Sequence, residues 1–218
     1  MFKFRRPTIN RVVMVLVYAD LIFFTASGLL TPIMAVFYVD EINKGSIALA
    51  GLVTAIFWVV KSAVQVPVSL YADNRRGERD DFAMMVVGYV IAALVPLVYF
   101  LYVTEVWQVY LLEALHGVGY GLMVPTYLAM FTRHIDKHRE NLEWTIHSNA
   151  VGLGYAAAAA IGGVMADRFG FRPMFLATSV IMMLSPFVLL FIRKNLYKSD
   201  GTIPDPEVAM RHYKEQGA

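Results

Sequence analysis

Residues 61–82 read KSAVQVPVSLYADNRRGERDDF, a segment that opens with a lysine inside an apolar run and ends in a turn carrying both signs of charge. The flanking residues 46–60 and 82–103 contain no charged side chain. Joined to its continuation through Leu70, the first flank is long enough to cross a bilayer, which takes about 20 apolar residues, and the second flank is long enough already. We therefore expect the charged end of the segment to be a short turn between two membrane-spanning helices.

The composition agrees with this interpretation. Of the 218 residues, 58% are hydrophobic and 17% are charged, whereas a soluble domain carries about 25% charged residues. The charges lie in short clusters between long apolar runs, which is typical of a membrane protein. The chain has no cysteine, which excludes disulfides, cysteine-ligated metals and thiol chemistry. The first apolar run is too long for a signal peptide, so we expect it to remain as a helix.

Six apolar stretches predict an all-α membrane protein with six transmembrane helices. They lie at about residues 12–38, 46–71, 82–103, 107–131, 142–166 and 171–193. The connections are short, so consecutive helices should be antiparallel neighbours. Residues 1–11 then form an N-terminal segment, residues 12–193 the helical bundle and residues 194–218 a polar tail.

Lysine and arginine are distributed unevenly between the two sides of this bundle. One side carries Lys44, Arg168 and Arg172. The side with both termini carries Lys3, Arg5, Arg6, Arg11, Arg75, Arg76, Arg79, Arg133, Lys137, Arg139, Arg193, Lys194, Lys198, Arg211 and Lys214. Because basic residues accumulate in cytoplasmic loops, we expect both termini to face the cytoplasm, in a multi-pass protein of the inner membrane.

The chain contains a short internal sequence repeat, which we call the echo. Residues 69–77 read SLYADNRRG and residues 163–170 read GVMADRFG, so both place Ala-Asp, then Arg and Gly, where a helix leads into a turn. Both segments lie between the second and third helices of a three-helix unit. Since each unit has an odd number of helices, the two copies face opposite sides of the membrane. The echo predicts a 3+3 inverted repeat, an arrangement that recurs in secondary transporters.

At these turns the chain resembles the N-terminal half of a major facilitator superfamily transporter, whose second and third helices are joined by G-x-L-A-D-R-x-G-R-K. The segment GGVMADRFGFRP matches this signature at the fifth–sixth junction. At the second–third junction Ser69 replaces the first glycine, and one extra residue precedes Gly77. The resemblance implies a gating motif made of Asp73, Arg75, Arg76, Gly77, Asp167, Arg168 and Gly170.

Two further stretches carry the resemblance. The segment LLEALHGVGYGLMVPTYLAMFTR is similar to the family's R-x-x-Q-G-x-G on the fourth helix, with Glu113 in place of the arginine and His116 in place of the glutamine. The family's antiporter motif G-x-x-x-G-P-x-x-G-G is met in part on the fifth helix, where Ala158 and Ala159 stand at the Gly-Pro positions, so antiport stays open. The family has twelve helices in two halves, so the resemblance implies that this half bundle pairs as a homodimer.

Asp20 and Lys61 are ionisable residues inside predicted spans. Each should lie roughly 13–15 Å from the cytoplasmic end of its helix, and an unpaired lysine at that depth costs roughly 2.5–3.5 kcal/mol. We therefore expect an ion pair between them. The pair would belong to a substrate or proton site, or would be a permanent strut. Gln65 follows Lys61 at helical spacing and can line the same cavity.

Glu113 and His116 are three residues apart and share a helix face, which Tyr120 extends. A desolvated carboxyl group beside a histidine can take up and release a proton; alternatively, the pair only fixes helix packing. The Glu-x-x-His spacing also occurs in di-iron bundles, but those need further glutamates that are missing here, so we expect no metal.

Three further features have less specific interpretations. Gly154, Ala158 and Gly162 form a small-residue stripe, which predicts a helix-packing interface inside the chain or with a partner. His134 and His138 have a metal-binding spacing, but we expect a solvated loop there. His147, near the start of the fifth helix, is either a cavity group or an ordinary interfacial residue.

These features predict a secondary transporter or facilitator that moves a small solute by alternating access, with coupling to protons through Glu113, His116 and Asp20. No nucleotide-binding loop is present in the sequence, so we expect no ATP-driven pumping. We expect no enzymatic activity, no cofactor and no nucleic-acid partner. The alternative is a membrane binding or assembly protein that keeps the fold without transporting.

Overall fold

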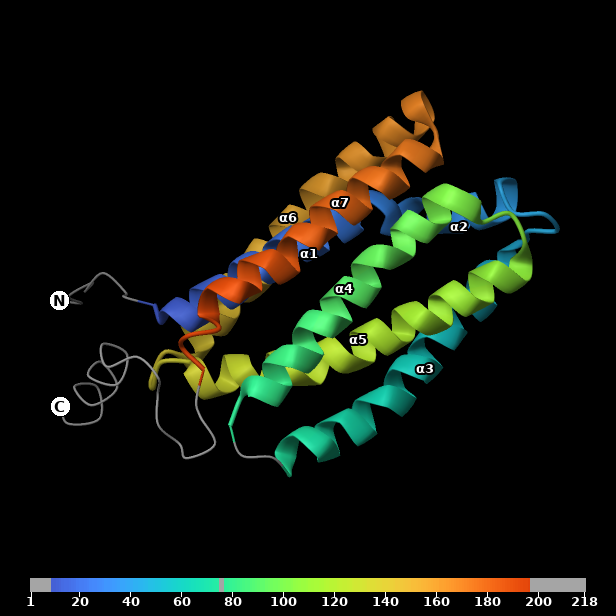
Figure 1. The fold of residues 1–218 in the computed structure, drawn as a ribbon. Coiled ribbons are helices and arrows are strands. Elements are labelled where there is room, and N and C mark those ends of the chain that lie inside the picture. Colours follow the sequence, from blue (N-terminus) through green and yellow to red (C-terminus); the bar gives the residue numbers. More distant parts are fainter. Residues whose placement is uncertain (1–8, 75–76, 197–218) are drawn as a thin grey trace.

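The computed structural model describes residues 9–74 and 77–196, which form a bundle of long helices (Figure 1). Arg75 and Arg76 of the expected gating motif lie outside the described residues, as do the basic terminal residues Lys3, Arg5, Arg6, Lys198, Arg211 and Lys214. The elements in chain order are α1 (Arg11–Leu30), η1 (Thr31–Ile33), α2 (Met34–Asp40), α3 (Ile47–Asp73), α4 (Arg79–Tyr102), α5 (Val106–His134), α6 (Glu140–Phe169), α7 (Phe171–Leu189) and η2 (Leu190–Ile192). The predicted all-α class is confirmed.

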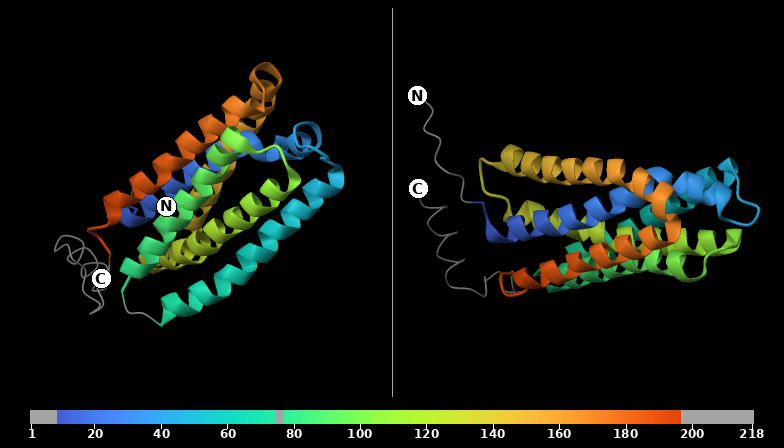
Figure 2. Two further views of the ribbon diagram at one scale, coloured as in Figure 1. Left: turned by 45° about the vertical axis from the view of Figure 1, so that its right-hand side comes forward. Right: turned by 90° about the horizontal axis from the view of Figure 1, so that it is seen from above.

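The long helices run up and down the bundle, so their ends gather at two opposite poles (Figures 1 and 2). We call the pole at which α1 begins the proximal end; α3, α5 and α7 end there, and α4 and α6 begin there. The opposite pole, where α2 ends and α3 and α5 begin, is the distal end.

The first predicted span is interrupted at Pro32. Helix α1 ends at Leu30, a 3₁₀ turn follows, and α2 then completes the stretch, because proline lacks the backbone N–H that a continuous helix needs. Pro67, Pro96 and Pro125, by contrast, lie inside the uninterrupted helices α3, α4 and α5.

Five helical stretches within the described ranges are long and apolar enough to cross a membrane. They are Arg11–Asp40, Ile47–Asp73, Arg79–Tyr102, Glu140–Phe169 and Phe171–Ile192. The predicted fourth span coincides with α5, which has 29 residues but is not among these five. Helix α5 contains Glu113 and His116 and ends in Arg133 and His134. Six spans therefore stay a prediction.

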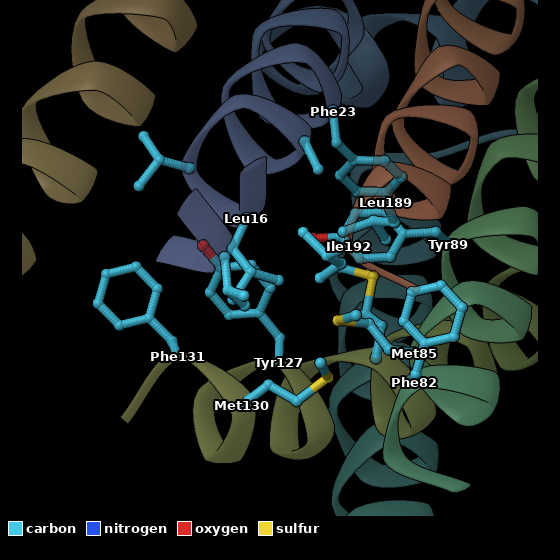
Figure 3. Close-up of a cluster of buried hydrophobic side chains, with 14 of the residues drawn as sticks. Leu16, Phe23, Phe82, Met85, Tyr89, Tyr127, Met130, Phe131, Leu189 and Ile192 are labelled. Atoms are coloured by element: carbon cyan, nitrogen blue, oxygen red, sulfur yellow. The ribbon is translucent and has the colours of Figure 1, made fainter. Parts of the chain in front are cut away.

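Two helices organise the packing of the bundle. Helix α1 packs against α6 and α7, whereas α5 packs against α3 and α4, and an α4–α7 contact joins the two groups. A proximal core forms around Leu16, Phe23, Tyr89 and Phe131, all of them buried (Figure 3). A distal core gathers Phe37, Tyr99 and Phe175 with their neighbours. Charged and polar side chains inside these cores consequently need partners.

The small-residue stripe of α6 faces α1. A Cβ added at Gly154 would lie 2.2 Å from Thr25 Oγ1, and one added at Gly162 would lie 2.2 Å from the carbonyl oxygen of Leu29. Ala158 is buried and lies next to Gly28 of α1. The stripe therefore lets two backbones of one chain approach closely, and of the two alternatives left open by the sequence, the contact inside the chain is the one observed.

The neighbouring glycines Gly162 and Gly163 provide a matched test of this contact. We expect Gly162→Ala to lower the free energy of unfolding by about 1–3 kcal/mol, because the new methyl group collides with backbone of α1. Gly163→Ala should be neutral or stabilise the protein by up to about 1 kcal/mol, since nothing lies within 4 Å of a Cβ at Gly163. Thermal unfolding of the purified variants in detergent measures the difference, and equal stabilities would contradict the described contact.

Candidate functional site

Glu113 is buried in the distal half of the bundle, two turns into α5. The hydroxyl groups of Tyr38 and Tyr99 each donate to its Oε1 at 3.1 Å. His116 Nδ1 lies 3.3 Å from Glu113 Oε2. Helices α2, α4 and α5 thus each contribute a polar group to this carboxylate. Sequence reasoning found the histidine and missed both tyrosines, although a buried tyrosine hydroxyl usually needs a partner.

A cavity of about 450 Å³ opens beside this cluster. Its wall includes residues of α1, α2, α3, α4, α5, α6 and α7. Glu113 and His116 lie in the wall together with many aromatic rings, and Tyr120 extends the wall one turn further along α5. A space of this size fits a drug-sized ligand.

Asp20 occupies a second polar cluster, in the proximal half of the bundle. The Tyr89 hydroxyl donates to its Oδ1, and His147 Nε2 lies 2.8 Å from its Oδ2. Tyr127 also faces this carboxylate. Asp20 is therefore surrounded by groups from α4, α5 and α6. The Asp20–His147 contact is the second carboxylate–imidazole pair of the bundle, and the sequence had left the role of His147 open.

The expected ion pair between Asp20 and Lys61 is wrong. Helix α1, which carries Asp20, packs against α6 and α7, while α3, which carries Lys61, packs against α5. The Lys61 ammonium instead lies 4.2 Å from the centroid of the Trp58 ring, where a cation–π contact replaces the carboxylate. Two residues must lie at a similar depth in the membrane to form an ion pair, but their helices must also be neighbours.

The remaining residues expected at the solute site do not form one group. Tyr120 lies between the two clusters: its ring is 4.9 Å from that of His116 and 5.9 Å from that of Phe23. Gln65 is half-buried on α3, one turn beyond Lys61. The structure thus brings Glu113, His116 and Tyr120 together and leaves Asp20, Lys61 and Gln65 outside that group.

A third polar cluster closes the proximal end. Glu78 and Asp81, at the start of α4, are both buried. Arg133 is ion-paired with Asp81 and lies 3.8 Å from Glu78 Oε1. His134 Nε2 lies 2.9 Å from Glu78 Oε2. The expectation of a solvated His134 is wrong, because α5 continues through His134 and turns its side chain inward; His138, by contrast, is exposed.

The expected gating residues lie at the two turns that carry the sequence echo. Asp73 is the exposed last residue of α3, and Asp167 and Arg168 are exposed in the last turn of α6. Gly77 has φ 99° and Gly170 has φ 76°, backbone angles that residues with a side chain rarely adopt. Each turn therefore needs its glycine for a conformational reason.

Comparison with known proteins adds an independent finding. The family model of the Major Facilitator Superfamily matches residues 16–214. Multidrug resistance protein MdtG of Dickeya zeae (strain Ech586) is 31% identical over 185 residues, which cover 80% of this chain and 43% of that protein. Multidrug resistance protein MdtG of Proteus mirabilis (strain HI4320) is 25% identical over 176 residues, which cover 78% of this chain and 42% of that protein. The chain therefore spans less than half the length of these relatives.

Proposed function

Because the chain belongs to the Major Facilitator Superfamily, we propose that it moves a small solute across a membrane by alternating access. The observation that carries the proposal is the burial of two carboxylates, Asp20 and Glu113, inside helices of a membrane protein, each beside a histidine. Ionisable groups at such positions are costly and mark ion or substrate pathways. The names of the relatives in the comparison are consistent with a solute of drug size.

The helix packing supports six spans built as a 3+3 inverted repeat. If α1, α3 and α4 correspond to α5, α6 and α7, the α3–α5 contact corresponds to the α6–α1 contact, and the α4–α5 contact to the α7–α1 contact; all four are extensive. The α4–α7 contact maps onto itself. Such an exchange of neighbours is what a two-fold axis through the bundle requires, and transporters with inverted repeats bind solute near that axis.

Helices α3 and α6 supply the surface for a second half. Helix α3 buries Leu49, Val53 and Ala72, and α6 buries Glu143, Ala158 and Gly162, although each helix has at least 27 residues. We place a second six-helix unit on these two helices, supplied by a second copy of the chain in a homodimer. The solute pathway would then run between the halves, with both termini on the cytoplasmic side of the inner membrane.

Protons are the coupling ion that the chemistry of the site favours. An imidazole group titrates near neutral pH, and the two pairs inside the bundle, Glu113–His116 and Asp20–His147, can each share one proton. Tyr120 lies between the pairs. Loading of a proton at Glu113–His116 or Asp20–His147 would change the charge inside the bundle, and that change would bias the bundle between its inward-facing and outward-facing states.

Uptake into liposomes tests this function. The purified chain is reconstituted, and uptake of aromatic dyes, sugars and organic acids is followed under a proton gradient, a membrane potential and a solute gradient. We expect uptake of at least one solute, and a loss of about tenfold or more in Glu113→Gln and Asp20→Asn. Wild-type protein that moves nothing under any gradient would contradict transport and support a binding or assembly role. Full uptake by both variants would contradict the site assignment alone.

A further inference from the structure

The cavity beside Glu113 has an unusual wall. Its lining residues include one carboxylate, Glu113, and no lysine or arginine of the described chain. Most of the remaining wall is apolar, and the aromatic rings in it include those of Phe24, Phe57, Trp58, Tyr99, Tyr120 and Phe175. The negative charge of a carboxylate therefore faces a space enclosed by the faces and edges of rings.

Glu113 lines this space and retains an open acceptor position. A carboxylate can accept about four hydrogen bonds, and Glu113 makes three contacts, with Tyr38, Tyr99 and His116. Across the parts of the chain that the structure describes, no lysine or arginine forms an ion pair with Glu113. The only ion-pairing contact described for Glu113 is with His116, whose imidazole carries a charge only when it is protonated. With a neutral imidazole the buried carboxylate has no counter-charge, which is costly, so an occupant of the cavity that carried a positive charge would be stabilised.

Two more buried polar atoms of the wall have no hydrogen-bond partner among residues 9–74 and 77–196. They are His116 Nε2 and Thr178 Oγ1. His116 already uses its Nδ1 to contact Glu113, which leaves Nε2 for another group. Native proteins pair nearly all buried polar atoms, and the two atoms are therefore available to hydrogen-bonding groups of a ligand.

The rim of the cavity already shows how a cation is held. Trp58 lines the cavity with 55% of its surface exposed, and the Lys61 ammonium lies 4.2 Å from the centroid of its ring. Aromatic faces attract cations through the ring quadrupole, tryptophan most strongly. This cavity-lining ring thus already contacts an ammonium group of the chain itself.

From these observations we infer that the cavity binds a bulky, apolar organic cation with a single positive charge, one ligand per chain. The ring faces hold the apolar body, and the open acceptor position of Glu113 holds the charge. The inference rests on the proposed function only for the role of this ligand as a transported solute. Each bundle supplies a complete set of these lining residues, so binding is expected at one site per chain.

Two ions of nearly the same shape and opposite charge test the inference. Tetraphenylphosphonium and tetraphenylborate are offered to the full-length chain in detergent, and binding is measured by equilibrium dialysis with protein-free micelles subtracted. We expect saturable binding of about one tetraphenylphosphonium per chain, and a ratio of the two affinities that favours the cation about tenfold or more. Comparable affinities of the wild-type protein for both ions would overturn the inference.

Two substitutions with opposite expected effects test whether Glu113 binds the positive charge of the ligand. Glu113→Gln keeps the size of the side chain and should abolish the preference for the cation. Lys61→Met removes a competing positive charge from the Trp58 ring and should raise the affinity for tetraphenylphosphonium a few-fold. Asp40→Asn, at the exposed end of α2, is the control and should change neither affinity. A cation preference that survives Glu113→Gln, or an affinity for tetraphenylphosphonium that is lowered by Lys61→Met, would overturn the assignment. Lys61 is half-exposed, so it can be changed without disturbing the core.

This measurement is separable from the uptake assay, because binding in detergent requires no gradient and no conformational cycle. Cation binding without uptake would contradict the proposed function and leave the ligand site standing. Uptake without any preference for the cation would support the proposed function and contradict the ligand site.

Discussion

Replacing His134 by alanine is expected to lower the free energy of unfolding by about 3–5 kcal/mol, the range found when one partner of a buried charged pair is removed. The His134 side chain has 0% of its surface exposed, and its Nε2 lies 2.9 Å from a carboxylate oxygen of Glu78. Glu78 is buried as well. The substitution therefore removes a hydrogen-bond partner from a buried carboxylate and also opens a void between α4 and α5.

The natural control is His138, four residues further along the chain and exposed. His138→Ala should change the free energy of unfolding by less than about 1 kcal/mol. Both variants would be compared with the wild-type protein by chemical unfolding in mixed micelles, with tryptophan fluorescence and helical circular dichroism as separate probes. If His134→Ala were as stable as His138→Ala, the buried pair would contribute nothing, and His134 would be solvated as its sequence context suggested.

The positions of the helices could be predicted from the sequence because they depend on local properties. Runs of apolar residues and the charged turns between them placed helix ends near residues 71, 103 and 131, and the structure ends α3 at Asp73, α4 at Tyr102 and α5 at His134. The error at the end of α5 had a consequence. Its last turn was assigned to a loop, so that His134 was expected in water although the helix carries it into the core.

The partners of the buried charges could not be predicted in the same way, because they depend on which helices are neighbours. Depth along a helix follows from the number of residues, and depth alone led to Lys61 as the partner of Asp20. His147 is seven residues into α6 and lies at a similar depth, so it satisfied the same criterion. Only the packing of α1 against α6 distinguishes the two candidates.

The small residues of α6 predicted their structural role more clearly than the charged residues predicted their partners. Their spacing predicted a close helix contact without naming the partner, and the structure supplies α1. The tyrosines around Glu113 show the opposite case. Tyr38 lies on α2 and Tyr99 on α4, and nothing in the spacing of either residue points to a carboxylate on α5.

The Asp20–His147 pair leads to the largest expected effect on transport. We expect Asp20→Asn to lower proton-driven uptake of the solute found in the uptake screen by about 100-fold, because an asparagine keeps the shape of the side chain and cannot take up a proton. Tyr89 can still donate to the asparagine oxygen, so the link that this hydrogen bond makes between α1 and α4 should survive. His147→Ala should reduce proton-driven uptake in the same direction.

A readout beyond the rate separates proton transfer from a structural role of this pair. Exchange of labelled for unlabelled solute across the membrane needs the conformational cycle without net proton movement, so Asp20→Asn should keep most of its exchange activity while net uptake is lost. Ser148→Ala, which alters an exposed neighbour of His147, should retain both activities. Loss of exchange together with uptake would make Asp20 a structural residue. An undiminished response of Asp20→Asn to the proton gradient would remove this pair from the coupling pathway and leave Glu113 and His116 as the site at which a proton is carried.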